Sequence, residues 1–158
     1  MVKKTKYRYP GALALIELHE QYLDKFYTAL TEAEKQNLTL PQTTDPAYTS
    51  PAALLYHVLE CARYYMVWIC QQLDLPDPGI DETPNRNEIA EKAGQYIAHL
   101  TERWRLPLIN VPEDSFYQPE YEARWGTKYC IDAMLEHAVM HPLRHEYQLR
   151  KMIAMSND

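Results

Sequence analysis

The segment from about residue 127 to residue 155 limits the possible fold more than any other stretch of this chain. Its apolar residues recur at spacings that place them on one side of a helix: Ile131, Leu135, Ala138, Leu149 and Ile153. His137, His141 and His145 are spaced four residues apart, about one helical turn, so they form a row beside that stripe. Six histidines scattered over 158 residues would give such a triple only roughly 0.01 times. The segment predicts a long amphipathic helix carrying a row of histidines.

Three other segments show the same helical periodicity. They cover about residues 11–33, a stretch from Ser50-Pro51 to about residue 73, and about residues 87–106. Ser50 and Pro51 are typical of a helix N-terminus, where serine caps the helix and proline occupies its first position. No alternating strand pattern accompanies them. We therefore predict an all-α four-helix bundle, with residues 1–158 forming a single domain.

The second predicted helix has two apolar sides. One is a stripe of aliphatic residues from Leu55 to Leu73, and the other is the ridge His57, Cys61, Tyr64 and Trp68. Such a helix is covered on both sides, here by the core on one and by a pocket or another subunit on the other. Prolines interrupt residues 107–127, which predicts a long loop that forms a lid or pocket wall.

Composition excludes several classes of function. The net charge is −6 and no dense basic stripe follows the short Lys3–Lys6 run, so we expect no nucleic-acid partner. The four glycines form no phosphate-binding motif. No apolar stretch approaches the ~18–20 residues that span a bilayer, so we expect no membrane association. Cys61, Cys70 and Cys130 form no CxxC pair, and three unpaired thiols suit a reducing, cytoplasmic location.

A helical wheel separates the three histidines of the last segment. His145 lies about 40° and His141 about 80° from the centre of the apolar stripe, whereas His137 lies about 120° away. His141 and His145 are therefore the inward-facing pair, and Gln148 continues their ridge. Two imidazoles make a weak site, so a third ligand from another helix is expected, and His57 is the leading candidate.

Each of these residues also has an ordinary interpretation. A single histidine such as His57 is commonly a hydrogen-bonded, partly buried side chain, and His19 and His99 have no partner at ligand spacing. His137 is interpreted as supporting or flanking the site. Cys61, one turn after His57, either reaches the same pocket or is a small buried hydrophobe. Glu136 or Glu146 is a candidate proton acceptor or partner to a ligand imidazole.

Pro142 directly follows His141 and bears on the spacing argument. Proline cannot donate to the Ala138 carbonyl, and its ring disfavours helical geometry at His141. Either the helix kinks around residues 138–142 or it breaks and restarts. A break would remove the one-turn spacing on which the paired ligands depend.

His57 in the run Leu54–Leu59, followed by His141, His145 and Gln148, resembles the pattern of the DinB-like (YfiT-type) metal-binding four-helix-bundle proteins. The resemblance implies a divalent metal ion, usually zinc or nickel, held by His57, His141 and His145 with water completing the shell. It also implies a homodimer. The family motif typically ends His-Arg-Gly-Gln, whereas this chain has His145, Glu146, Tyr147 and Gln148.

Two functional hypotheses follow. The first is a metal-dependent transferase, hydrolase or isomerase, because some relatives use a low-molecular-weight thiol. In that case Gln148 would hydrogen-bond the metal-bound water, and the 107–127 loop would line a cavity. The second is a non-catalytic bundle in which a metal ion ties the second helix to the fourth. Part of the ridge His57, Cys61, Tyr64 and Trp68 would then be a dimer interface.

Overall fold

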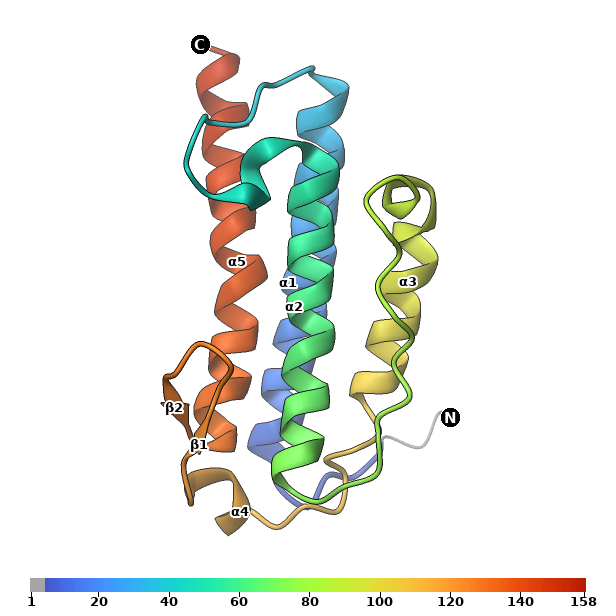
Figure 1. The fold of residues 1–158 in the computed structure, drawn as a ribbon, viewed down its shortest axis with the longest axis vertical. Coiled ribbons are helices and arrows are strands. Elements are labelled where there is room, and N and C mark those ends of the chain that lie inside the picture. The colour runs from blue at the N-terminus through green and yellow to red at the C-terminus, as the bar shows by residue number, and fades with distance from the viewer. Residues whose placement is uncertain (1–4) are drawn as a thin grey trace.

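The computed structural model describes residues 5–158, and four long helices dominate it (Figure 1). These are α1 (Pro10–Lys35), α2 (Pro51–Gln72), α3 (Ile89–Trp104) and α5 (Ile131–Ser156). The shorter elements are the 3₁₀ helix η1 (Pro46–Thr49), the one-turn α4 (Asp114–Tyr117), and the strands β1 (Tyr121–Glu122) and β2 (Lys128–Tyr129). The predicted all-α class is confirmed, and each predicted helix is present.

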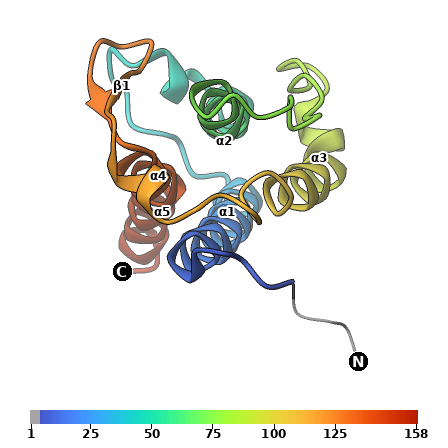
Figure 2. The ribbon, with the colours of Figure 1, turned by 90° about the horizontal axis from the view of Figure 1, so that it is seen from below.

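The four long helices lie side by side around one core (Figures 1 and 2). The most extensive packing joins α1 to α5, and α2 packs on both α3 and α5. The apolar stripe predicted for the last helix is buried along its whole length: Ile131, Leu135, Ala138, Leu149 and Ile153. Among the described residues, no helix is both long enough and apolar enough to cross a membrane.

Local sequence explains how α2 begins and why α5 continues past its proline. The Ser50 side chain accepts a hydrogen bond from the backbone N–H of Ala53 at 3.0 Å, and Pro51 occupies the first turn, as predicted. α5 is unbroken from Ile131 to Ser156 with Pro142 inside it, so the alternative of a broken helix is wrong. Pro142 is itself buried, and the packing of α5 against α1 outweighs the lost backbone hydrogen bond.

The segment predicted as one long loop contains a short antiparallel hairpin. Tyr121 pairs with Tyr129 and Glu122 with Lys128, and Gly126 has φ +86°, a left-handed conformation that glycine adopts without strain. Two-residue strands are too short to show alternation in a sequence, which is why the hairpin was not predicted.

The hairpin covers the second apolar side of α2. The indole N–H of Trp68 donates to the Glu122 carbonyl at 3.2 Å, and the backbone N–H of Arg124 donates to the Tyr64 hydroxyl at 3.0 Å. This part of the ridge predicted to face a pocket or a subunit is therefore covered by the chain itself. The hairpin turn also comes close to the N-terminal half of α2, where Arg124 lines a pocket together with Tyr56 and His57.

Candidate metal centre

Three histidines converge between α2 and α5. His57 comes from α2, and His141 and His145 come from consecutive turns of α5. One nitrogen from each imidazole lies within 4.8 Å of the others, and the Nε2 atoms of His57 and His141 are 3.0 Å apart. His141 is 8% and His145 7% exposed, while His57 is half-buried. The structure therefore brings together the three residues predicted as ligands.

Tyr48 of η1 holds the ring of His145. The Tyr48 hydroxyl lies 2.7 Å from Nδ1 of His145 and also donates to Oε1 of Gln148. Since the hydroxyl proton points to Gln148, the Tyr48 oxygen accepts from Nδ1–H of His145. This tautomer leaves the Nε2 lone pair of His145 free, which is how a ligand histidine is usually oriented.

The other two imidazoles have different surroundings. Nδ1 of His57 faces the Cys61 sulfur at 3.9 Å, which places that thiol beside the site but behind a ligand ring. Burial raises the pKa of the Cys61 thiol, although the positive charge of Arg124 acts against this rise. Nδ1 of His141 is buried and has no hydrogen-bond partner among the described residues. No hydrogen bond to Nδ1 therefore fixes the tautomer of His141, and its polar contact is the one between its Nε2 and that of His57.

The site favours neutral imidazoles. Burial lowers the pKa of His57, and it lowers the pKa of His141 to about 2 and that of His145 to about 4. The neighbouring histidine charges lower the last two further, because adjacent imidazolium ions repel each other. Neutral imidazole is the form that binds a metal ion, so the three rings are ready to act as ligands near pH 7.

The remaining candidates lie around or away from these three rings. His137 stacks on Trp125 of the hairpin turn, with ring centroids 5.4 Å apart, and does not join the cluster of converging nitrogens. Gln148 is exposed, accepts from the Tyr48 hydroxyl, and acts against the effect of burial by raising the pKa of His145 through a side-chain hydrogen bond. Glu146 pairs with Arg150 at 3.3 Å, and Glu136 is exposed.

A pocket of about 290 Å³ opens beside His57. Its lining comes from α2, from η1 and the residue before it, and from two loops: Asp45, Pro46, Ala47, Tyr56, His57, Glu60, Cys61, Arg86 and Arg124. Arg124 belongs to the 107–127 segment that the sequence predicts to be a lid or pocket wall. Of the three converging histidines, His57 lines this pocket, so a small molecule can approach the cluster from the His57 side.

The donor set fits a borderline divalent cation. Two nitrogens bound to one tetrahedral ion at about 2.0–2.1 Å are separated by ~3.3 Å, close to the 3.0 Å between the Nε2 atoms of His57 and His141. Imidazole nitrogens suit zinc and nickel, whereas calcium and magnesium prefer oxygen ligands. Three protein ligands leave at least one position for water or a substrate atom.

Tyr48 and Arg86 are the site residues that sequence reasoning missed. Tyr48 is 97 residues from His145, and no spacing rule connects the two positions. The only local feature that could have drawn attention to Tyr48 is its position just before Ser50, the residue that caps α2. Comparison with known proteins adds no further candidates: no family model, curated protein or solved structure matches this chain.

Proposed function

We propose that this chain is a divalent-metal-binding protein of the DinB-like type, in which His57, His141 and His145 hold zinc or nickel. The observation that supports this most strongly is the convergence of three neutral imidazoles from two helices, with a pocket alongside. A single buried histidine is common in proteins, but three that direct nitrogens at one point repel each other once charged and stabilise the fold best with a cation between them.

We further propose that the centre is catalytic, as a metal-dependent hydrolase or a transferase that uses a low-molecular-weight thiol. A zinc or nickel ion held there would supply Lewis acidity, lowering the pKa of a bound water or thiol. Tyr48 fixes the His145 tautomer, and the pocket beside His57 admits the reactant. The packing of α2 on α5 keeps the ligands in place.

The alternative is a non-catalytic bundle in which the metal ion joins α2 to α5 and the chain forms a homodimer. Two large apolar side chains one heptad apart on α5 favour this alternative, because Met140 is 50% and Tyr147 63% exposed. The two proposals share the metal site. They differ in whether the pocket beside His57 has a ligand.

Elemental analysis of untagged protein tests the shared claim. Wild type is expected to hold about one zinc or nickel ion per chain, and His57→Ala and His141→Ala to hold none, because two imidazoles bind weakly. His19→Phe is the matched control, since it removes a buried histidine outside the cluster. Wild type that stays metal-free after incubation with zinc and with nickel would contradict the proposal. If wild type does hold the metal, an assay of thiol transfer distinguishes the two roles. Activity in wild type that is lost in His145→Ala supports the catalytic role.

A further inference from the structure

The pocket beside His57 contains two arginines without an acidic partner. Arg86 comes from the turn before α3 and Arg124 from the hairpin turn, and both are exposed. Within residues 5–158 neither guanidinium forms an ion pair. Instead, Arg86 lies over the ring of Tyr56 at 5.7 Å, and Arg124 lies over the ring of Tyr64 at 4.1 Å. A guanidinium stacked on an aromatic ring is held in place while its edge N–H groups stay free to donate.

The acidic residues of the same pocket are already occupied by other groups. Asp45 accepts from the backbone N–H of Ala47 at 2.9 Å, capping η1. Glu60 accepts from the Thr83 hydroxyl at 2.6 Å and lies 4.0 Å from Arg63, outside the pocket lining. The pocket lining thus carries two carboxylates that already have hydrogen-bond partners and two guanidiniums that have no acidic partner among the described residues. The side-chain donors left for a ligand in this pocket are therefore those of the two guanidiniums, which match an anionic group.

Arg124 is the arginine closer to the histidines. Its charge acts on both His57 and Cys61, whereas Arg86 affects neither. Tyr56 and Tyr64, on which the two arginines stack, are eight residues apart on α2, which corresponds to ~12 Å along a helix. His57 and Cys61 lie between them in the sequence. A ligand held by Arg124 would thus lie beside Cys61 and reach toward His57, and Arg86 would be over Tyr56 at the other end of the pocket.

We propose that this pocket binds the carboxylate of a small organic acid through Arg124, with the rest of the molecule directed toward His57, His141 and His145. The inference rests on the proposed function and adds the chemical class of the ligand. The planar guanidinium matches a carboxylate through two parallel hydrogen bonds. A volume of about 290 Å³ accommodates only a small molecule, and Arg86 favours a second acidic group at the opposite end.

Cobalt-loaded protein allows the metal site and the carboxylate subsite to be tested separately. The visible bands of bound cobalt report on the three histidines alone. Titration with 3-mercaptopropionate, 2-mercaptoethanol and cysteamine then compares an acidic, a neutral and a basic thiol, each read from the sulfur-to-cobalt absorption. Wild type is expected to bind 3-mercaptopropionate at least about tenfold more tightly than 2-mercaptoethanol, because a hydrogen-bonded charge pair is worth that much. Cysteamine should bind most weakly.

Variants test whether Arg124 causes the preference. Arg124→Gln is expected to lower affinity for 3-mercaptopropionate about tenfold, leave 2-mercaptoethanol unchanged and keep the cobalt bands. Arg124→Lys should recover only part of the loss, since lysine lacks the planar fork. Arg86→Gln should weaken a dicarboxylic thiol such as mercaptosuccinate more than 3-mercaptopropionate. Arg8→Gln, an exposed charge change outside the pocket lining, should have no effect.

Two outcomes would overturn the proposal: equal binding of the acidic and neutral thiols by wild type, or an unchanged preference in Arg124→Gln. Absence of cobalt bands would instead count against the metal site. In that case, ligand-observed NMR of metal-free protein with propionate and propionamide still decides the subsite. Binding of propionate alone, lost in Arg124→Gln, supports it, and equal signals from both probes reject it. Competition by inorganic phosphate as strong as that by propionate would reject the assignment to a carboxylate.

Discussion

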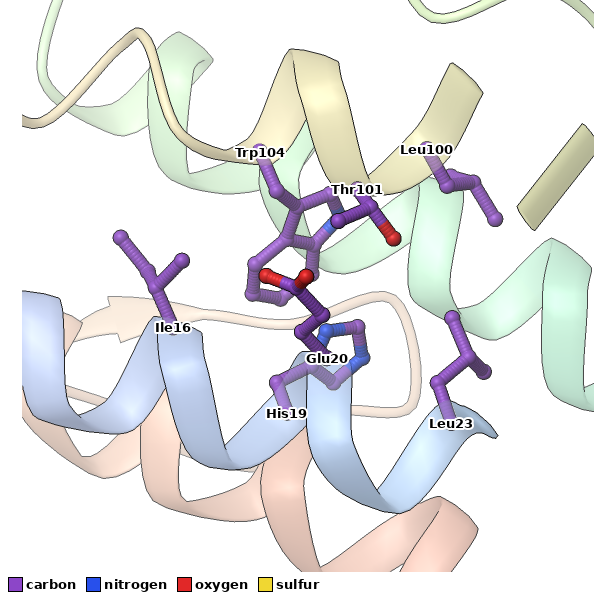
Figure 3. Close-up of a pocket in the computed structure, with 7 residues that line it drawn as sticks. All are labelled: Ile16, His19, Glu20, Leu23, Leu100, Thr101 and Trp104. Atoms are coloured by element: carbon purple, nitrogen blue, oxygen red, sulfur yellow. The ribbon is translucent and has the colours of Figure 1, made fainter. Parts of the chain in front are cut away.

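Histidines are buried at two places in this molecule, but only one of the two places has the geometry of a metal site. His19 lies between α1 and α3, is 3% exposed, and stacks on Trp104 with ring centroids 3.8 Å apart and planes 13° from parallel (Figure 3). The space around it has essentially no volume, about 0 Å³. Around His57, three imidazoles face each other beside a pocket. Burial lowers the pKa of His19 to about 3, just as it lowers the pKa of the three converging rings.

The comparison shows which features distinguish a ligand from a core residue. Burial and a lowered pKa occur at both places, so neither identifies a metal site. The difference lies in the convergence of nitrogens and in access. Nε2 of His19 has no hydrogen-bond partner among the described residues, yet His19 belongs to no group of three possible metal ligands there, and the Trp104 ring stacks on it. The interpretation of His19 as an ordinary buried side chain agrees with this placement.

The largest expected difference between His19 and the three converging histidines is in how much zinc stabilises the folded chain. With free zinc at about 1,000 times its dissociation constant, wild type should gain about 4 kcal/mol, or roughly 10 °C in melting temperature. His145→Ala should gain almost nothing, because it lacks a ligand. His19→Phe should keep the full gain. Calorimetry with and without zinc measures each shift, and a zinc-dependent gain in His145→Ala equal to that of wild type would place the ion elsewhere.

The free energy of unfolding should fall at acid pH because His19 is held neutral in the folded chain. The pKa of His19 is about 3 in the folded chain and about 6.5 when unfolded, so the unfolded state binds the proton more tightly. Stability is therefore retained above pH 6.5 and falls as the pH drops toward 3, by about 3 kcal/mol at pH 4. His19→Phe removes this contribution while preserving a flat apolar ring against Trp104.

Urea unfolding at pH 7 and pH 4 measures the difference between the two chains, with a chelator present in both. The chelator matters because protons also displace metal from histidine ligands. Wild type should lose about 3 kcal/mol more than His19→Phe on acidification. Equal losses of stability would mean that His19 is not held neutral in the folded chain. Burial would then not have the same effect on His19 as on the three converging histidines.

The sequence predicted the elements of this fold better than the contacts between them. Helical periodicity is a local property, so the four helices and the buried stripe of α5 followed directly from it. The His141–His145 pair followed from its spacing. The tolerance of Pro142 depends on packing against α1, which the sequence alone does not show. Tyr48, Arg86 and the hairpin turn approach α2 and α5 only through tertiary structure, and no spacing relates them to the histidines.

Tyr48→Phe tests whether the site depends on support from outside α2 and α5. The substitution removes the hydrogen bond to Nδ1 of His145 but keeps the ring that lies against it. Loss of such a partner typically weakens metal binding 10- to 100-fold, about 1.4–2.7 kcal/mol. Competition with a chromophoric chelator measures the affinity. Gln148→Ala is the companion variant, and its effect should be smaller because the Gln148 side chain is exposed, whereas the Tyr48 hydroxyl lies 2.7 Å from Nδ1 of His145.

Glu146→Gln should have the smallest effect on metal affinity and stability. It tests whether a residue next to a ligand in the sequence also belongs to the metal site. Glu146 lies between His145 and Tyr147 in the sequence, yet its carboxylate pairs with Arg150, which also pairs with Glu32 of α1. Partly exposed pairs of this kind contribute about 0.2–1 kcal/mol. We therefore expect a small loss of stability in urea unfolding and no change in metal affinity. A metal affinity lowered tenfold or more would show that Glu146 acts on the adjacent His145. The pairing of Glu146 with Arg150 would then not place its carboxylate outside the site.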